Sequence, residues 1–557
     1  MSLTTALNSG LKGILAHQRQ VEVTGNNIAN VNTPGYSRQT LTISPSATVN
    51  IDGLLLGQGV DVESVNREYD KFVSGQLVGQ NSTLGQESAK SAPLAELERV
   101  LGIGEDSLAG QIESFFGAWH DLSGNPSGSV ERGQVIYKGE NLLESFSQVK
   151  SDMVRVGQNI NDKLNAEVGS INLKLQEVAD LNAAIKEKET LGHVANTEKD
   201  RRDLLVKELS GILGVQTFNT GSGQIGLHLP GGIPLVQGDR ALDFEAFYQG
   251  GDLQFEVRAG DVELSAKRTN FGGKFRGLLD MRDDFIPGLQ QEIQQLEHRV
   301  VTEVNAQHAA GYGLDGETGR TFFSQTTGLQ SETGFANTTD HNFGTGTIDV
   351  NGTSVNIDAT NNSLSGIRGA INNADTGVVA AVVNNGGAYH LNLTPETPGG
   401  AVNFTSNLSG GSWTFSNQDA DAELFDAVGS EDIHVQISDP RQVAAAGATA
   451  GEPGDNENAL AVYALADSRD NPDGQTYVEN YGRIAATVGT EAKRNTMARQ
   501  GASDTMNQLE NLRESIVGVS IEQEMMNLTR FQKGFEASSR YVQTIDEMMG
   551  TIIGMKR

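Results

Sequence analysis

The glycine-rich stretch GSGQIG, residues 221–226, comes closest in this sequence to a cofactor-binding motif. Its glycines fit G-x-G-x-x-G, and Asp243 follows near the distance expected for a contact to the ribose of a dinucleotide. Such a site needs a helix that begins at the loop, because the amides of the first turn must face the pyrophosphate. Here Pro230 and two glycines follow instead. The stretch therefore predicts a β-turn and no cofactor.

Residues that could bind a metal or attack a substrate are scattered or missing. The nearest two of the nine histidines, His298 and His308, are ten residues apart. The acidic stretch 467–474 places Arg469 and Asn480 where a calcium loop needs its first and last carboxylates, so it predicts a solvated turn. The sequence has no cysteine, no G-x-S-x-G and no Walker A motif. We therefore predict no catalytic residue and no metal site, and a protein that is not an enzyme.

Composition limits the possible partners. The chain has 557 residues with 41 basic and 71 acidic side chains, a net charge of −30, which repels nucleic acids and anionic lipid headgroups. No window reaches the 18 apolar residues of a membrane span, and no Sec-type signal is predicted at the N-terminus. An apolar content of 37% is enough for cores in three or four domains. We expect neither nucleic-acid binding nor membrane insertion.

Both ends of the chain carry apolar residues at a spacing of seven, which is the repeat of a coiled coil. Near the start these residues are Leu7, Ile14, Val21 and Ile28. Near the end they are Ile521, Leu528, Phe535, Val542 and Met549, with Ile545 beside them. Either stripe alone fits an ordinary amphipathic helix as well as it fits a coiled coil. Two such repeats at opposite ends of the chain favour pairing of the two helices with each other. Gly518 and the S-x-x-Q sequence from Ser520 predict where the returning helix begins.

Between the ends, helical stripes alternate with strand-like segments. Apolar residues step by three or four over 142–185 and again over 281–304, and a weaker stripe includes Leu509, Leu512 and Ile516. Short alternating runs with glycine-rich turns over 214–268 and 340–440 predict antiparallel strands, with one helix at 363–374. We therefore predict a multidomain α+β protein with terminal coiled-coil helices and a long helical bundle that carries inserted β-rich domains.

The expected domain boundaries follow from these patterns. Residues 1–45 with 520–557 form an axial coiled-coil domain. Residues 46–213, 269–335 and 441–519 form the helical bundle. Residues 214–268 form a β-rich insertion, and residues 336–440 form an outer α+β domain.

The stretch GNNIANVNTPGYSRQ, residues 25–39, must end the first helix. Thr33 precedes a proline and is pushed out of the α region, and Pro34 with Gly35 suits the centre of a type II turn. Side-chain amides here can cap the last helical carbonyls or bond to a neighbouring chain, and local capping is the favoured interpretation. These amides belong to Asn26, Asn27, Asn30 and Asn32.

The same stretch resembles the N-terminal signature of bacterial flagellar rod, hook and hook-associated proteins. Residues 531–555, FQKGFEASSRYVQTIDEMMGTIIGM, resemble their closing motif. Interior segments, among them GQGVDVESVNREYDKFVSGQL at 57–77 and DRRDLLVKELSGILGV at 200–215, are similar to the hook-associated protein 1 family of hook–filament junction proteins. Residues 345 to about 400 resemble the hook-IN module, an insertion found in several flagellar proteins.

The resemblance implies a structural adapter between hook and filament that assembles as a ring of identical copies. It implies export from the cytoplasm by the flagellar type III apparatus with a chaperone, and contacts to the hook protein and the second junction protein. The terminal helices would line the axis, with the bundle outside them and the β-rich domains outermost. The assembly interface would consist of the heptad residues together with Asn26, Asn27, Asn30, Pro34, Gly35 and Tyr36.

Three alternatives remain open at this point. A hook or distal rod protein would share the end motifs but lack the interior segments quoted above. An adhesin displayed on the flagellum would depend on the outer region near 340–440. A cell-wall hydrolase would need a catalytic domain with paired carboxylates, which the sequence does not show.

Overall fold

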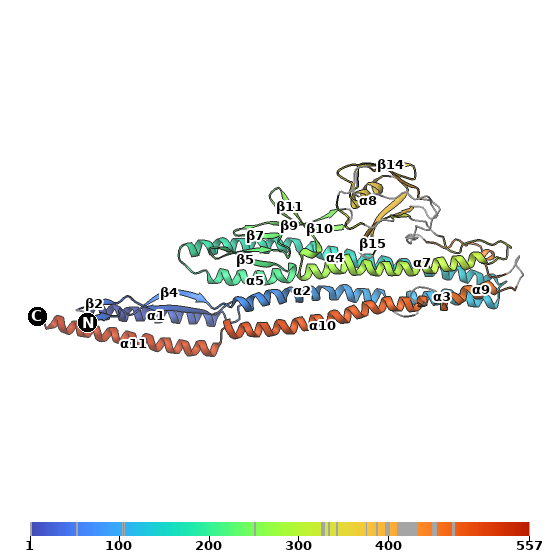
Figure 1. Ribbon diagram of the computed structural model, residues 1–557. Helices are drawn as coiled ribbons and strands as arrows, with labels where there is room; N and C mark the ends of the chain where they lie inside the picture. The colour runs from blue at the N-terminus through green and yellow to red at the C-terminus, as the bar shows by residue number, and fades with distance from the viewer. Residues whose placement is uncertain are drawn as a thin grey trace.

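The computed structural model is an elongated molecule with both termini at one end (Figure 1). It describes residues 3–51, 54–102, 104, 106–249, 252–324, 329–331, 335–340, 343–374, 376–385, 388–395, 402–408, 433–447, 454–469 and 474–555. Much of the expected outer domain, including 409–432, and residues 470–473 of the acidic stretch therefore lie outside the described residues. No helix in the described ranges is long and apolar enough to cross a membrane.

Eleven α-helices are assigned within the described residues. They are α1 (Leu3–Ala29), α2 (Lys71–Val100), α3 (Leu108–Gly124), α4 (Ser129–Thr190), α5 (Asn196–Leu213), α6 (Gly273–Asp280), α7 (Ile286–Ala310), α8 (Leu364–Asn373), α9 (Glu457–Ala464), α10 (Tyr477–Val517) and α11 (Ile521–Gly554). A π-helical turn, η2 (Met281–Phe285), joins α6 to α7. The short 3-10 helices are η1 (Arg268–Asn270), η3 (Pro440–Gln442) and η4 (Leu465–Asp467).

The strands of the described chain pair antiparallel in six small sheets. Two lie near the N-terminus, β1 (Gln39–Pro45) with β4 (Val60–Arg67), and β2 (Val49–Ile51) with β3 (Leu54–Leu56). The first insertion contains β5 (Gln216–Gly221), β6 (Gln224–His228), β7 (Pro234–Gln237) and β8 (Arg240–Ala241), then β9 (Asp243–Gln249), β10 (Asp252–Ala259) and β11 (Val262–Ala266). The outer unit contains β12 (Leu329–Gln330), β13 (Gly346–Val350), β14 (Thr353–Ile357), β15 (Val378–Asn385), β16 (Ala388–Pro395) and β17 (Phe404–Ser406).

The helices of the bundle come from separated parts of the chain. Helix α2 packs against α5, α6 and α10, and α4 packs against α3, α5 and α7. The apolar stripe predicted for 142–185 lies within α4, and most of its members are buried there. Helix α4 begins at Ser129, earlier than predicted. The apolar stripe does not reveal its first turns because Val130 and Tyr137 are exposed there. In the weaker stripe, which lies on α10, Leu509 packs against a small buried cluster, whereas Leu512 and Ile516 are exposed.

The expected start of the bundle at residue 46 is wrong. Strands β1 and β4 form a ribbon that runs along α1, with Gln39 opposite Arg67 and Pro45 opposite Val60. The alternating sequence VDVESVNR suits a strand, and Lys12 of α1 binds Asp61 at 2.7 Å, which fastens the ribbon to the terminal helix. The bundle begins with α2 at Lys71 instead.

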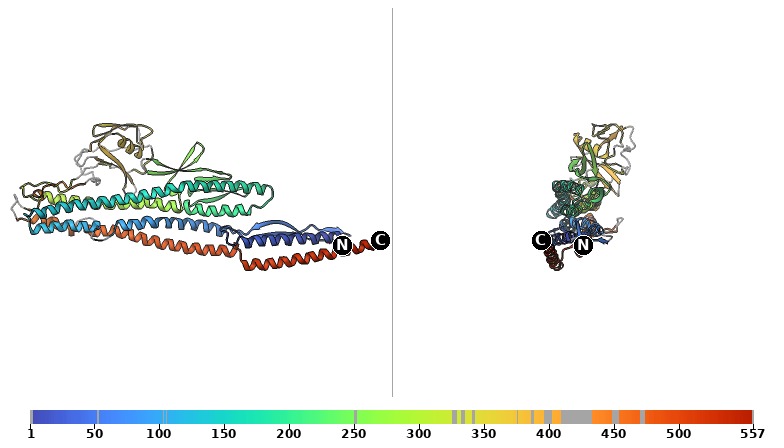
Figure 2. Two further views of the ribbon diagram at one scale, coloured as in Figure 1. Left: turned by 180° about the vertical axis from the view of Figure 1, so that it is seen from behind. Right: turned by 90° about the vertical axis from the view of Figure 1, so that its left-hand side faces the viewer.

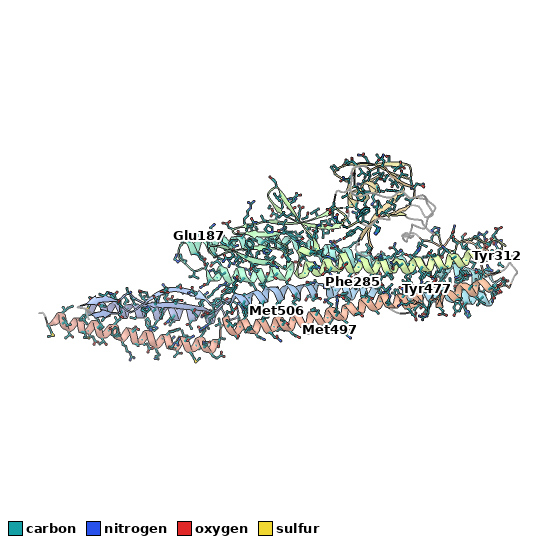
Figure 3. All side chains as sticks on the ribbon, viewed as in Figure 1. Glu187, Phe285, Tyr312, Tyr477, Met497 and Met506 are labelled. Carbon is teal, nitrogen blue, oxygen red and sulfur yellow. The ribbon has the colours of Figure 1, made fainter. Side chains whose placement is uncertain are left out.

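The β-rich insertions lie on the side of the bundle away from the terminal helices (Figure 2). The glycine-rich stretch at 221–226 turns between β5 and β6, with Gly221, Ser222 and Gly223 at positive φ, as predicted for a β-turn. The outer unit has a hydrophobic core of its own, built by α8 and the strands around it. Ser363 caps α8 through the amide of Gly366, at the position that the sequence predicts for this helix. Figure 3 places Tyr312 and Tyr477 at the end of the bundle far from the termini.

Candidate assembly site

The terminal helices α1 and α11 lie antiparallel, side by side (Figure 1). Their contact is close because glycines leave room for the opposite helix. A Cβ built on Gly10 would lie 2.6 Å from Val542 Cγ2, and one built on Gly534 would lie 2.6 Å from the ring of His17. Gly13 faces Ser538 in the same way. We call this contact the small-residue seam, and it consists of Gly10, Gly13, Gly534 and Ser538, with the buried Ala6 on the same face of α1.

The heptad residues flank this seam and do not form its centre. Half-buried side chains belong to Leu7, Ile14, Val21, Ile28, Leu528, Val542 and Met549. Ile521 and Phe535 are exposed, and Ile545 is buried. Sequence reasoning therefore missed the small residues, although Ala6, Gly10 and Gly13 recur at a helical spacing of four and three.

Asn27 connects α1 to the first strand. Its Oδ1 accepts hydrogen bonds from the backbone N–H of Gln39 at 2.9 Å and the hydroxyl of Tyr36 at 2.8 Å. Its Nδ2 donates to the backbone carbonyl of Gln39 at 2.9 Å. The buried amide thus satisfies both backbone groups of one strand residue, as a neighbouring strand would. Burial, together with the charges of Asp200 and Glu524, raises the pKa of Tyr36 to about 12, so the hydroxyl keeps its proton at neutral pH.

Glu524 connects α11 to the same point. Its side chain is 2% exposed and accepts from Arg38 Nε at 2.8 Å and from Asn27 Nδ2 at 3.3 Å. The backbone N–H of Arg38 also donates to the carbonyl of Val517, the last residue of α10. These contacts bring the end of α1, the start of α11 and the end of α10 together. We call this cluster the joint, and it consists of Asn27, Tyr36, Arg38, Gln39 and Glu524.

A second set of contacts fixes the joint to the bundle. Asp200 of α5 accepts from the backbone N–H of Ser37 at 3.1 Å and from Arg67 at 2.7 Å. Arg67 also binds Asp203 at 2.6 Å, and it is mostly buried. Arg513 of α10 donates to the backbone carbonyls of residues 35 and 36. The orientation of the terminal helices relative to the bundle is therefore set by charged hydrogen bonds.

The remaining residues of the predicted site have local roles. Asn30 Nδ2 donates to the backbone carbonyl of Asn26 and to its Oδ1, both at 2.9 Å, so the Asn30 amide caps the end of α1 as favoured from the sequence. The Asn26 side chain accepts this hydrogen bond and does not itself cap a carbonyl within the described chain. Pro34 and Gly35 form the predicted turn, in which Tyr36 N–H donates to the Thr33 carbonyl and Gly35 has φ +82°.

The terminal helices leave apolar side chains exposed. On α1 these are Leu11 and Leu15. On α11 they are Ile521, Met525, Met526, Phe535, Tyr541, Met548, Ile552 and Ile553. The two helices together carry five basic and six acidic residues, a net charge of −1, although the whole chain has −30. An apolar, nearly neutral surface is typical of a protein interface. No group of three or more metal-binding side chains occurs within the described residues.

Replacing Glu524 with glutamine is expected to loosen the joint. The change keeps the shape of the side chain but removes the charge that pairs with Arg38, which is about one-fifth exposed. Loss of one charge-assisted hydrogen bond costs about 1 kcal/mol, which is about a fivefold change in an opening equilibrium. Hydrogen exchange of the peptide covering 36–41 should therefore be about fivefold faster in the variant.

Glu536→Gln is the matched control for this experiment. Glu536 lies on the same helix and pairs with Lys533, but both side chains are more than half exposed. Exposed pairs contribute little to stability, so exchange at 36–41 should stay at the wild-type rate. Equal exchange rates in both variants would contradict the role assigned to Glu524.

Comparisons with known proteins agree with this geometry. Three family models match the chain: flagella basal body rod protein over residues 7–36, flagellar hook-associated protein FlgK helical domain over 94–323, and flagellar basal body rod FlgEFG protein C-terminal over 514–555. The first and third cover most of α1 and α11, and the second covers much of the bundle. All three models describe proteins of the bacterial flagellum, and this is the class of protein that the chain resembles.

Full-length relatives narrow the class further. Flagellar hook-associated protein 1 of Salmonella typhimurium is 25% identical and that of Escherichia coli is 26% identical, each aligned over 100% of both chains. The solved structure of the flagellar hook junction protein FlgK from Burkholderia pseudomallei has the same fold, with a TM-score of 0.57, 16% identity, and coverage of 80% of this chain and 100% of that one. The chain is therefore similar over its whole length to flagellar hook-associated protein 1.

Proposed function

We propose that this chain is the structural adapter that joins the flagellar hook to the filament, as a ring of copies held together by α1 and α11. The observation that carries this proposal is the terminal helix pair, which exposes apolar side chains on a nearly neutral surface of an otherwise acidic protein. Identical copies with a charge of −30 repel one another, so their contacts are most favourable where that charge is absent. The family name, hook-associated protein 1, supports the location.

The partners in this proposal are the hook protein on one side and the second junction protein on the other. The chain would be exported from the cytoplasm through the flagellar type III apparatus, with a chaperone bound before export. The axial part would comprise α1, α11 and the ribbon of β1 and β4, with the bundle outside it and the β-rich units outermost. The role is structural and involves no catalysis.

Assembly would also complete the folding of the ends. The buried residues of α11 that the structure describes are Glu524 and Ile545, so the pair buries little apolar surface in a single chain. Helices in proteins gain most of their stability from packing an apolar face, so a helix pair that buries little apolar surface is marginal in water. Apolar contact with neighbouring copies would therefore stabilise α1 and α11, and a weakly folded end before assembly would keep the chain narrow during export.

Deletion of the gene tests the proposed function. Cells without the protein should make hooks but no filaments, because no adapter would hold the filament, and flagellin should accumulate in the medium. Electron microscopy of the cells and immunoblots of the medium measure both effects. Filaments of normal number and length on the deletion strain would contradict the adapter role, and a plasmid copy of the full chain should restore filaments if the role is correct.

A further inference from the structure

Half of the methionines in this chain lie on α11 or directly after it. Four of the ten are on α11, at positions 525, 526, 548 and 549, and a fifth, Met555, directly follows the helix. Four of them, Met525, Met526, Met548 and Met555, are between 49% and 82% exposed. In contrast, the bundle methionines Met153, Met281 and Met506 are at most 5% exposed. These exposed thioethers form two pairs, one near each end of α11, and neither pair is needed for the fold of the single chain.

We propose that the exposed methionines on α11 and directly after it, Met525, Met526, Met548 and Met555, contact α1 of the next copy and are a site of reversible oxidation that blocks this contact. The inference rests on the proposed function, because it needs copies that assemble through their terminal helices. It adds a chemical modification and a particular pair of surfaces to that function.

The end of α11 extends past the start of α1. Gly10 faces Val542 and Gly13 faces Ser538, so the antiparallel register places Leu3 opposite about residue 548. Met555 and the residues before it therefore lie beyond the described part of α1, as Figure 1 shows at the C-terminal end. The apolar surface of α11 continues here without a partner helix from its own chain.

The outer face of α1 suits this surface. Leu11 and Leu15 are both 51% exposed, and at 100° per residue they lie about 100–160° around α1 from Gly10 and Gly13, which face α11. A subunit with two different apolar faces can pair one face with the other on the next copy. Such head-to-tail contacts close into rings or continue as helices. Because the two helices together have a net charge of only −1, charge repulsion does not oppose this contact.

Methionine suits a contact that must adapt. Its unbranched side chain has three rotatable bonds and a polarisable sulfur, so it fills irregular gaps better than a branched residue. A subunit that lies between two different kinds of neighbour needs a surface that can repack. The same sulfur makes the surface sensitive to oxidation.

The modification is the transfer of one oxygen atom from hydrogen peroxide. The O–O bond of the peroxide breaks and an S–O bond forms, so the thioether is oxidised to a sulfoxide and the peroxide is reduced to water. The product is polar and can no longer pack against leucine without a hydrogen-bond partner. Each sulfoxide buried in the contact should weaken it about tenfold.

Peptide mapping by mass spectrometry tests where oxidation occurs. The full chain is treated with hydrogen peroxide, and each methionine is scored for the gain of one oxygen. Met525, Met526, Met548 and Met555 should oxidise, whereas Met153, Met281 and Met506 should stay reduced. Figure 3 places Met497 on α10, where it is 60% exposed, and it should oxidise too as a control outside the terminal helices. Oxidation of the buried methionines at the same rate would overturn the selectivity.

Binding to hooks tests the consequence. Hooks are isolated from the deletion strain and incubated with untreated chain, peroxide-treated chain, or peroxide-treated chain in which Met525, Met526, Met548 and Met555 are leucines. Untreated chain should bind. The amount of treated wild type that binds should be at least about tenfold lower. Reduction of the treated wild type by methionine sulfoxide reductases should restore binding. Treated Met497→Leu should behave like treated wild type, because its α11 methionines still oxidise.

The binding experiment distinguishes failure of this inference from failure of the proposed function. Failure of the untreated chain to bind hooks would overturn the adapter role itself. Normal binding of treated wild type, with the four methionines shown to be oxidised, would overturn only the inference. Loss of binding that the reductases do not restore would also overturn it. If the leucine variant resists peroxide and binds, the oxidation acts at these four residues.

Discussion

Replacing Gly10 with valine is expected to abolish incorporation of the protein into flagella. A Cβ at this position would lie 2.6 Å from Val542 Cγ2 and 3.0 Å from the ring of Tyr541, so α1 and α11 could not keep their spacing. Overpacking of this kind costs about 1–3 kcal/mol, which is large for a helix pair with few buried residues. Immunoblots of flagella isolated from the deletion strain that produces the variant measure incorporation.

Gly25→Val is the matched control for this prediction. Gly25 lies on the same helix, and a Cβ there would meet nothing within 4 Å, so the two variants share the same change in helix propensity. Gly25→Val should enter flagella at close to the wild-type level. The thermal unfolding of the bundle should be unchanged in both variants, because neither glycine contacts it. Normal incorporation of Gly10→Val would contradict the importance of the small-residue seam.

The parts of this fold that the sequence predicts are those set by local rules. Pro34 with Gly35 specifies its turn through backbone sterics alone, and Ser520 caps α11 as the sequence indicates, with its hydroxyl accepting from the N–H of Gln523. The long stripe within α4 reflects one continuous buried face, which periodicity detects well. The strand β4 is not predicted, because residues 46–213 are assigned to the helical bundle, and nothing local shows that this segment lies against α1.

The centre of the assembly site could not be predicted in the same way. Asn27 and Glu524 are 497 positions apart, and only the antiparallel pairing of α1 with α11 brings them together. From the sequence, Asn27 is equally suited to local capping, which is the role that Asn30 has. The heptad pattern identified the correct helices, but the glycines opposite Val542 and His17 let the helices approach on a neighbouring face. Small residues contribute little to a hydrophobic pattern, so their role became visible only in the packed structure.

The second large expected effect is a loss of stability in acid, and it arises from a buried histidine at the far end of the bundle. His308 Nδ1 donates to the backbone carbonyl of Arg320 at 2.7 Å, and its Nε2 accepts from the backbone N–H of Ala444 at 3.0 Å. The ring packs beside Trp119 at a centroid distance of 6.0 Å. The accepting nitrogen must be unprotonated, so this arrangement holds the neutral ring. Burial, and to a lesser extent the charges of Arg320 and Arg132, lower the pKa of His308 from 6.5 to about 4.

Acid should therefore destabilise this end of the bundle at pH values above the pKa of the folded histidine. Between pH 6.5 and pH 4 the unfolded chain binds a proton at residue 308 that the folded chain does not, so stability falls as the pH falls through this window. The expected loss between pH 7 and pH 5 is about 2 kcal/mol. Urea unfolding followed by Trp119 fluorescence, with Trp413 replaced by phenylalanine, measures it.

His308→Gln provides the comparison that isolates the histidine. Glutamine keeps one donor and one acceptor but does not titrate, so the variant should lose about 2 kcal/mol less than the parent between pH 7 and pH 5. Carboxylates that also titrate in acid are common to both proteins, and their contribution cancels in the difference. The variant can be less stable than the parent at pH 7, because its amide does not reproduce the ring contact with Trp119. The test is therefore the slope of stability against pH, and parallel slopes in the two proteins would show that His308 is not held neutral by the fold.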